Sequence, residues 1–193
     1  MNEAKYREAE RKLWTSIGRE PSERFVVLRS TGTRVRVQEV GAGESVLFIH
    51  GGPNAGSTWA PLLEHLEGYR CLLVDRPGTG LSDPHPLTPA ELAGGFGATF
   101  VGDVLDGLGV DRAHVVASLF LWGADDTFGG RDVAEHVVAL MGDARLEMMP
   151  AASHLPWLDD PAAAALATDA FLGAGRRADT GTQPSPSAAG PAA

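Results

Sequence analysis

The chain has 193 residues, of which 44% are hydrophobic and 21% charged, and its formal net charge is −9. These values are typical of one globular domain with a real core. The acidic balance argues against nucleic acid or an anionic membrane surface as a partner. A single cysteine, Cys71, excludes an internal disulfide and a cysteine-based zinc site.

The first 22 residues form a predicted N-terminal arm. Residues 2–17 have a helical pattern that ends before Gly18 and Pro21, with an apolar face made of Tyr6, Leu13, Trp14 and Ile17. Two outcomes stay open: the arm packs on the outside of the domain, or it frays. Residues 1–17 lack the apolar core of a signal peptide, and no stretch has membrane-spanning length, so we expect a cytoplasmic protein.

Residues 23–175 are expected to form the folded domain. Strand patterns cover residues 23–30, 34–40, 45–49, 69–74 and 145–149, and helix patterns cover 59–66, 88–108 with an interruption at 94–97, 132–141 and 161–172. Thr88-Pro-Ala-Glu91 is a capping box with proline at the first helical position. Alternating strands and helices predict an α/β fold, a mostly parallel sheet flanked by helices.

One apolar run in the second half of the chain carries acids at its end. Residues 114–122 are uninterrupted and are followed by Gly123, Asp125 and Asp126. Such a run predicts a single strand that is buried on both faces of a parallel sheet. Open α/β sheets bind and react with their ligands at the carboxyl ends of such strands, so the acidic loop is a candidate site.

The end of the chain differs in composition. From about Gly173 it consists of Gly, Ala, Pro, Ser and Thr with few other residues. A segment of this kind cannot bury a core, and residues 176–193 are predicted to be a disordered tail.

Four motifs occur in an order that resembles the α/β-hydrolase fold family, over most of residues 23–175. They are Val46-Leu-Phe-Ile-His-Gly-Gly-Pro53, Leu73-Val-Asp-Arg-Pro-Gly-Thr-Gly-Leu-Ser-Asp83, Leu119-Phe-Leu-Trp-Gly-Ala-Asp-Asp126 and Ser153-His-Leu-Pro-Trp-Leu-Asp-Asp-Pro161. They are similar to the third strand with its oxyanion turn, the fourth strand with its glycine-rich turn, the strand that delivers the catalytic acid and the loop that delivers the catalytic histidine.

The resemblance implies a set of site residues. Asp126 corresponds to the acid, with Asp125 as the near alternative, and His154 corresponds to the base. The oxyanion turn comprises His50, Gly51, Gly52 and Pro53, in which the Gly52 amide is the donor and His50 holds the turn. In this chemistry a serine attacks a carbonyl, the imidazole takes its proton and the carboxylate orients the imidazole. No metal or organic cofactor is implied.

The family's nucleophile motif, Gly-x-Ser-x-Gly, does not occur in the sequence. The chain passes from the run-up to that motif directly into the acid strand, so the motif, its helix, the sixth strand and the cap are left out. We therefore expect the fifth and seventh family strands to be fused into one, with apolar strand surface left exposed. Three residues are candidate substitutes for the nucleophile: Ser118, predicted to be buried in mid-strand, Ser57, also interpretable as a helix-start hydroxyl, and Asp125.

Three functional hypotheses follow. The first is a hydrolase of a small ester-, lactone- or amide-like substrate. The second is a pseudoenzyme or binding module that keeps a pocket without a nucleophile. The third is a shortened gene product with no selected function, which the absence of linker residues at the fusion favours over the second. The sequence leaves the substrate and the oligomeric state open.

Overall fold

The computed structural model describes residues 2–51, 54–93, 95–116, 119–127, 130–139 and 145–179. The strands are β1 (Ser22–Val27), β2 (Arg34–Gly41), β3 (Glu44–Ile49), β4 (Tyr69–Val74), β5 (His114–Val116), β6 (Leu119–Gly123) and β7 (Arg145–Met149). The helices are α1 (Glu3–Ser16), η1 (Gly56–Trp59, a 3₁₀ helix), α2 (Ala60–Leu63), α3 (Pro89–Ala93), α4 (Phe96–Leu108), α5 (Arg131–Ala139), α6 (Pro156–Asp159) and α7 (Pro161–Asp179).

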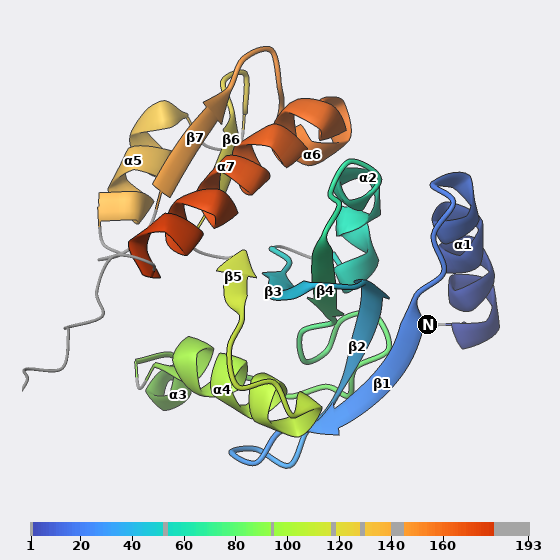
Figure 1. Ribbon diagram of the computed structural model, residues 1–193. Helices are drawn as coiled ribbons and strands as arrows, with labels where there is room; N and C mark the ends of the chain where they lie inside the picture. Colours follow the sequence, from blue (N-terminus) through green and yellow to red (C-terminus); the bar gives the residue numbers. More distant parts are fainter. Residues whose placement is uncertain are drawn as a thin grey trace, which may run out of the picture.

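The strands form two sheets (Figure 1). The larger has the order β1-β2-β4-β3-β5, and the smaller pairs β6 with β7. The β1–β2 and β2–β4 pairings are antiparallel, whereas β4–β3, β3–β5 and β6–β7 are parallel. The architecture is therefore an α/β fold with mostly parallel strands flanked by helices, as the sequence predicts.

Residues 114–122 are predicted to be one strand of one sheet, but their described parts, β5 and β6, pair in two different sheets. β5 pairs with β3, from Val46 opposite His114 to Phe48 opposite Val116, whereas β6 pairs with β7 from Leu119 opposite Arg145 onward. The two described parts of the apolar run thus have different partner strands, and the two residues between them, 117 and 118, lie outside the described residues. An apolar run predicts burial but contains no information on pairing partners, so the pattern alone could not reveal the change of sheet.

Two core clusters lie on opposite faces of the larger sheet. One contains side chains of α1, α2 and α7 and also reaches the smaller sheet through Leu121 and Met149. The other packs α4 against β1, β2, β3 and β4. Figure 1 shows the same division, with α3 and α4 together at one end of the picture and α2 and α7 on the other side of the strands. Helices therefore cover both faces.

Local signals in the sequence fix several boundaries. Asn2 caps α1 by accepting from the Lys5 amide at 3.1 Å. The capping box is present at α3, where the Thr88 amide donates to Glu91 at 2.8 Å and the Glu91 amide donates to the Thr88 hydroxyl at 3.2 Å. These contacts satisfy amides that a helix start leaves without intrahelical partners.

The end of the described chain differs from its predicted boundary. Helix α7 continues to Asp179, past the expected end at residue 172 and into the segment assigned to a tail from residue 176. Residues 180–193 lie outside the described residues. Among the helices that are described, none is long and apolar enough to cross a membrane. The cytoplasmic location stays a prediction.

The buried carboxylate of Asp75 organises the turn after β4. It is 1% exposed, accepts from the Gly56 amide at 2.7 Å and from the Leu81 amide at 2.9 Å, and lies 3.3 Å from the Arg36 guanidinium. Gly80 has φ +51°, and a Cβ there would come within 2.0 Å of the Asp75 carboxylate. The acid and glycine of this motif are therefore a mutually dependent pair.

Arg36 connects this carboxylate to the N-terminal arm. Its side chain is 2% exposed and forms ion pairs with Glu10 of α1, with Glu23 of β1 at 2.6 Å and with Asp75. Burial alone would lower the pKa of Arg36, but the three surrounding carboxylates outweigh it and raise that pKa. Together with buried Trp14, these ion pairs fix α1 onto the domain rather than leaving it frayed.

Substituting Gly80 by alanine tests the dependence of the turn on Asp75. We expect Gly80→Ala to lower the free energy of unfolding by about 3–5 kcal/mol, because the new methyl group displaces a buried carboxylate from its cation. Gly78→Ala is the matched control, since Gly78 lies in the same turn at φ +79° and a Cβ there would contact only Pro84 at 3.9 Å. It should cost about 1 kcal/mol, the left-handed penalty alone.

Urea unfolding of the three proteins provides the comparison. Equal losses in the two variants would show that backbone strain, and not the Asp75 contact, explains the glycine at position 80.

Candidate active site

The loop that carries Asp126 is attached to the end of β7. The Ala124 amide donates to Met149 O at 2.9 Å, and the Asp125 amide donates to Ala152 O at 3.0 Å. The Asp126 amide closes the turn by donating to Gly123 O at 3.3 Å. Backbone bonds thus bring the carboxyl ends of two parallel strands, and the loops after them, into register.

Gly123 allows these two loops to approach closely. A Cβ at this position would lie 1.9 Å from Ser153 O and 2.2 Å from Ala152 O. Both contacts are far below van der Waals separation, so a side chain here would displace the segment that precedes His154. The glycine of the Trp-Gly-x-x-Asp pattern is therefore a packing requirement of the site.

The structure brings His154 and Asp126 together. The His154 Nδ1 and the Asp126 Oδ2 are 3.0 Å apart, and the Asp126 side chain is 3% exposed against 55% for His154. An ionised carboxylate can only accept a hydrogen bond, so Nδ1 carries the proton and the ring's basic lone pair is on Nε2. A buried carboxylate oriented on a solvent-accessible imidazole is the arrangement that a general base requires. Asp125, the alternative acid, has an exposed side chain.

A second carboxylate, which the sequence did not single out, fixes the histidine loop. Asp159 of α6 accepts from the Ser153 amide at 2.6 Å and from the Ser153 hydroxyl at 2.7 Å. These two bonds, the hydroxyl first, lower the pKa of Asp159. The sequence predicts no role for Asp159, because residues 153–161 are expected to form one loop and nothing in the sequence links position 159 to position 153.

The turn after β3 is joined to the turn after β4 by His50. This side chain is 1% exposed; its Nε2 accepts from the Arg76 amide at 3.1 Å, and its Nδ1 lies 3.2 Å from Gly51 O. Burial, with a smaller effect from the Arg76 charge, lowers the pKa of His50, so the neutral ring is favoured. Gly51 is exposed. Gly52 and Pro53 lie outside the described residues.

The candidate nucleophiles are distributed differently. Ser118 lies outside the described residues. Ser57 is half-buried in the first turn of η1, in hydrogen-bond contact with Tyr6 of the N-terminal arm. Asp125 is on the acid loop itself. Across the part of the chain that the structure describes, no group of three or more histidine, cysteine, aspartate or glutamate side chains could hold a metal ion.

Mostly parallel strands with helices on both faces, and with polar turns at the carboxyl ends of the strands, are the arrangement of the alpha/beta hydrolase fold. A model of the alpha/beta hydrolase fold family matches residues 44–118. Solved structures share the fold. The carboxylesterase CesB (YbfK) of Bacillus subtilis has a TM-score of 0.71 at 13% identity, covering 88% of this chain and 98% of that one. The naproxen esterase of the same species has a TM-score of 0.72 at 12% identity, covering 89% and 99%.

Curated relatives give the same answer from sequence. A 2-hydroxy-6-oxo-6-phenylhexa-2,4-dienoate hydrolase of Burkholderia cepacia is 30% identical over 54% of this chain and 38% of its own length. A 2-hydroxy-6-oxononadienedioate/2-hydroxy-6-oxononatrienedioate hydrolase of Paraburkholderia phymatum is 35% identical over 49% and 35%. The chain has the alpha/beta hydrolase fold, and the match to the family model covers residues 44–118 of its 193. It spans little more than a third of the length of these relatives.

Protonation of His50 should weaken the fold at acid pH. The folded pKa lies below the ordinary 6.5, so at intermediate pH the unfolded chain binds the proton that the folded chain excludes. The stabilisation is therefore complete above about pH 6.5 and is lost as the pH falls through the folded pKa, with a slope of at most about 1.4 kcal/mol per pH unit. Urea unfolding as a function of pH measures this slope.

His50→Gln supplies an amide oxygen in place of Nε2 and cannot titrate, so it should remove this part of the slope. His65→Gln, at an exposed position of the same half of the chain, should leave the slope unchanged. A His50→Gln profile parallel to that of the wild type would contradict the assignment.

Proposed function

We propose that the protein hydrolyses a small ester-, lactone- or amide-like substrate through the pair His154 and Asp126, with the carbonyl oxygen held at the turn of residues 50–53. The observation that supports this most strongly is the 3.0 Å contact between the exposed imidazole and the buried carboxylate. Backbone bonds between the two loops, together with the bonds from Ser153 to Asp159, hold the segments that carry this pair.

Each group has a definite role in this chemistry. The Nε2 of His154 takes the proton of the attacking hydroxyl and then returns it to the leaving group. Asp126 keeps Nδ1 protonated and stabilises the positive charge that develops on the ring. Backbone amides of the turn after β3 donate to the developing oxyanion, and one such donor contributes about 2.7–4 kcal/mol. His50 holds this turn from below without taking part in proton transfer.

The named relatives support the reaction class. The curated ones are named as hydrolases of 2-hydroxy-6-oxo-dienoates, and the structural neighbours include carboxylesterases. All these names describe hydrolysis of carbonyl compounds.

The sequence without a Gly-x-Ser-x-Gly motif favours one other candidate function, a binding module that keeps the pair but performs no chemistry. The two candidates differ in whether a hydroxyl of the chain is activated, and Ser118 and Ser57 are the hydroxyls to test.

Hydrolysis of p-nitrophenyl acetate by the full chain, with fluorophosphonate labelling and peptide mapping, tests the proposal. We expect a rate above background, a stoichiometric label on one serine, and loss of both in His154→Ala. Asp126→Asn should lower kcat roughly 10²–10⁴-fold, because the ring loses its orientation and its counter-charge. His136→Ala, at an exposed position on α5, is the matched control and should retain the wild-type rate.

A protein that melts cooperatively yet shows neither hydrolysis nor label would contradict the enzymatic proposal and leave the binding module. Hydrolysis that persists in His154→Ala would place the chemistry elsewhere.

A further inference from the structure

A cavity of about 620 Å³ lies between the larger sheet and α4, away from the His154 loop. Five parts of the chain line it: the ends of β3 and β5, the turn after β4, the segment before α3, and α4. The lining residues are Ile49, Arg76, Pro77, His85, Leu87, Phe96, Gly97, Ala98, Phe100, Val101 and Val115.

One wall of the cavity is aromatic. The rings of His85 and Phe96 lie 6.0 Å apart at 15°, and those of Phe96 and Phe100 lie 6.0 Å apart at 25°. The opposite wall is aliphatic, with half-buried Ile49 and Val115 from adjacent strands. Two apolar walls of this kind favour a flat or extended apolar body, and the volume is in the range that protein pockets use for small molecules.

Leu87 marks the rim, where its side chain stays 41% exposed. An occupant of the cavity would cover this leucine together with the half-exposed faces of Phe96 and Val101. Covering this accessible apolar surface with a ligand would therefore contribute favourable binding free energy through the hydrophobic effect.

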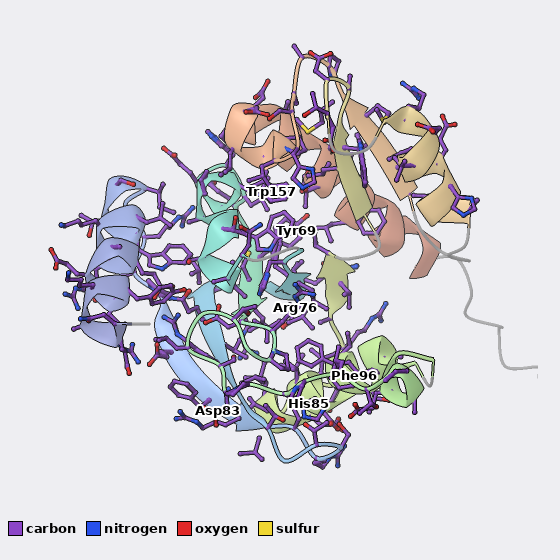
Figure 2. The ribbon with its side chains drawn as sticks, turned by 180° about the vertical axis from the view of Figure 1, so that it is seen from behind. Tyr69, Arg76, Asp83, His85, Phe96 and Trp157 are labelled. Atoms are coloured by element: carbon purple, nitrogen blue, oxygen red, sulfur yellow. The ribbon has the colours of Figure 1, made fainter. Side chains whose placement is uncertain are left out.

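Two side chains of the lining, His85 and Arg76, can carry a positive charge. His85 Nε2 lies 2.9 Å from Glu91, whose pKa the Thr88 amide and hydroxyl and then His85 lower to about 2, so a charge on His85 is neutralised locally. Arg76 supplies the remaining charge of the lining; its field contributes to lowering the pKa of His50. A guanidinium has five N–H donors, so it can keep a protein contact and still donate to an anion. Figure 2 shows Arg76, His85 and Phe96 around this space.

We propose that this cavity binds a small carboxylate with an apolar, preferably aromatic, body: the body lies between the Phe96–Phe100 wall and the strands, and the carboxylate meets Arg76. The inference goes beyond the proposed hydrolysis, because binding here requires neither His154 nor a nucleophile. Guanidinium and carboxylate match in charge and in planar geometry, which gives the site its preference among apolar ligands.

The test uses the full chain and 1-naphthaleneacetate, with the neutral 1-naphthaleneacetamide as the matched probe. Isothermal titration should show saturable binding of the acid, tighter than the amide by about tenfold or more. Arg76→Gln should remove the difference between the two probes while the amide still binds.

Two glycines of α4 provide a matched pair of variants. A Cβ at Gly97 or at Gly102 would meet no atom within 4 Å, but only Gly97 lines the cavity. Gly97→Leu should fill the space and weaken acid binding at least about tenfold, whereas Gly102→Leu should leave it within about twofold. Both variants should melt cooperatively, since each replaces a helix glycine at which a Cβ meets no atom within 4 Å.

Methyl resonances of the wild type give a readout that needs no variant: the probe should shift Val101 and Val115 but not Val26 on β1. Absence of saturable binding to the cooperatively folded protein would overturn the proposal. Equal losses of acid binding in Gly97→Leu and Gly102→Leu would also overturn it. Equal affinities of the wild type for the acid and the amide would do the same. Because hydrolysis is assayed separately, failure here leaves the proposed function untouched, and the reverse also holds.

Discussion

The structure depends above all on one buried carboxylate. Asp75 lies at the carboxyl end of β4 with almost no exposure, and it is tolerated there because Arg36 and two amides surround it. Removing one partner of such a pair costs about 3–5 kcal/mol, since the other charge stays buried and uncompensated. The same cluster holds the start of η1 through Gly56, and the adjoining Arg76 amide holds His50. The turn after β3 is thus positioned from the β4 turn.

Arg36 extends this constraint to the N-terminal arm. Its pairing with Glu10 makes α1 part of the charge-compensated core, although the sequence supports only an amphipathic helix of uncertain attachment. Glu10 lies on that helix among Arg7, Arg11 and Lys12, where every charge has the pattern of a solvated face. Burial of a helix carboxylate depends on a cation contributed by a strand far along the chain, and no local pattern encodes such a partner.

How much could be predicted varies with the range of the interaction. Strands β4 and β7 and the capping box follow from local periodicity and side-chain chemistry, and all have the predicted bounds. Asp126 and His154 were named from family motifs, and the structure places them 3.0 Å apart. The pairing of β5 and β6 in two different sheets was missed because apolar runs do not specify partners. The cavity beside α4 was also missed, because five segments that are distant in the sequence line it and no local pattern indicates how they pack.

Division into two sheets has a consequence for the site. Among the described strands, β6 pairs only with β7, and β3 lies in the other sheet. The described strand pairings therefore do not fix the position of the His154 loop relative to the turn after β3. Side chains do this instead: Trp157 of α6 lies 4.5 Å from Trp59 and donates to Thr58 O at 3.1 Å, and Tyr69 donates to Asp169 of α7 at 2.6 Å (Figure 2). Each such contact contributes about 1 kcal/mol, far less than a strand pairing does in sum. The loops of Asp126 and His154 are therefore joined to each other by backbone hydrogen bonds, whereas side-chain contacts of this kind join them to the larger sheet.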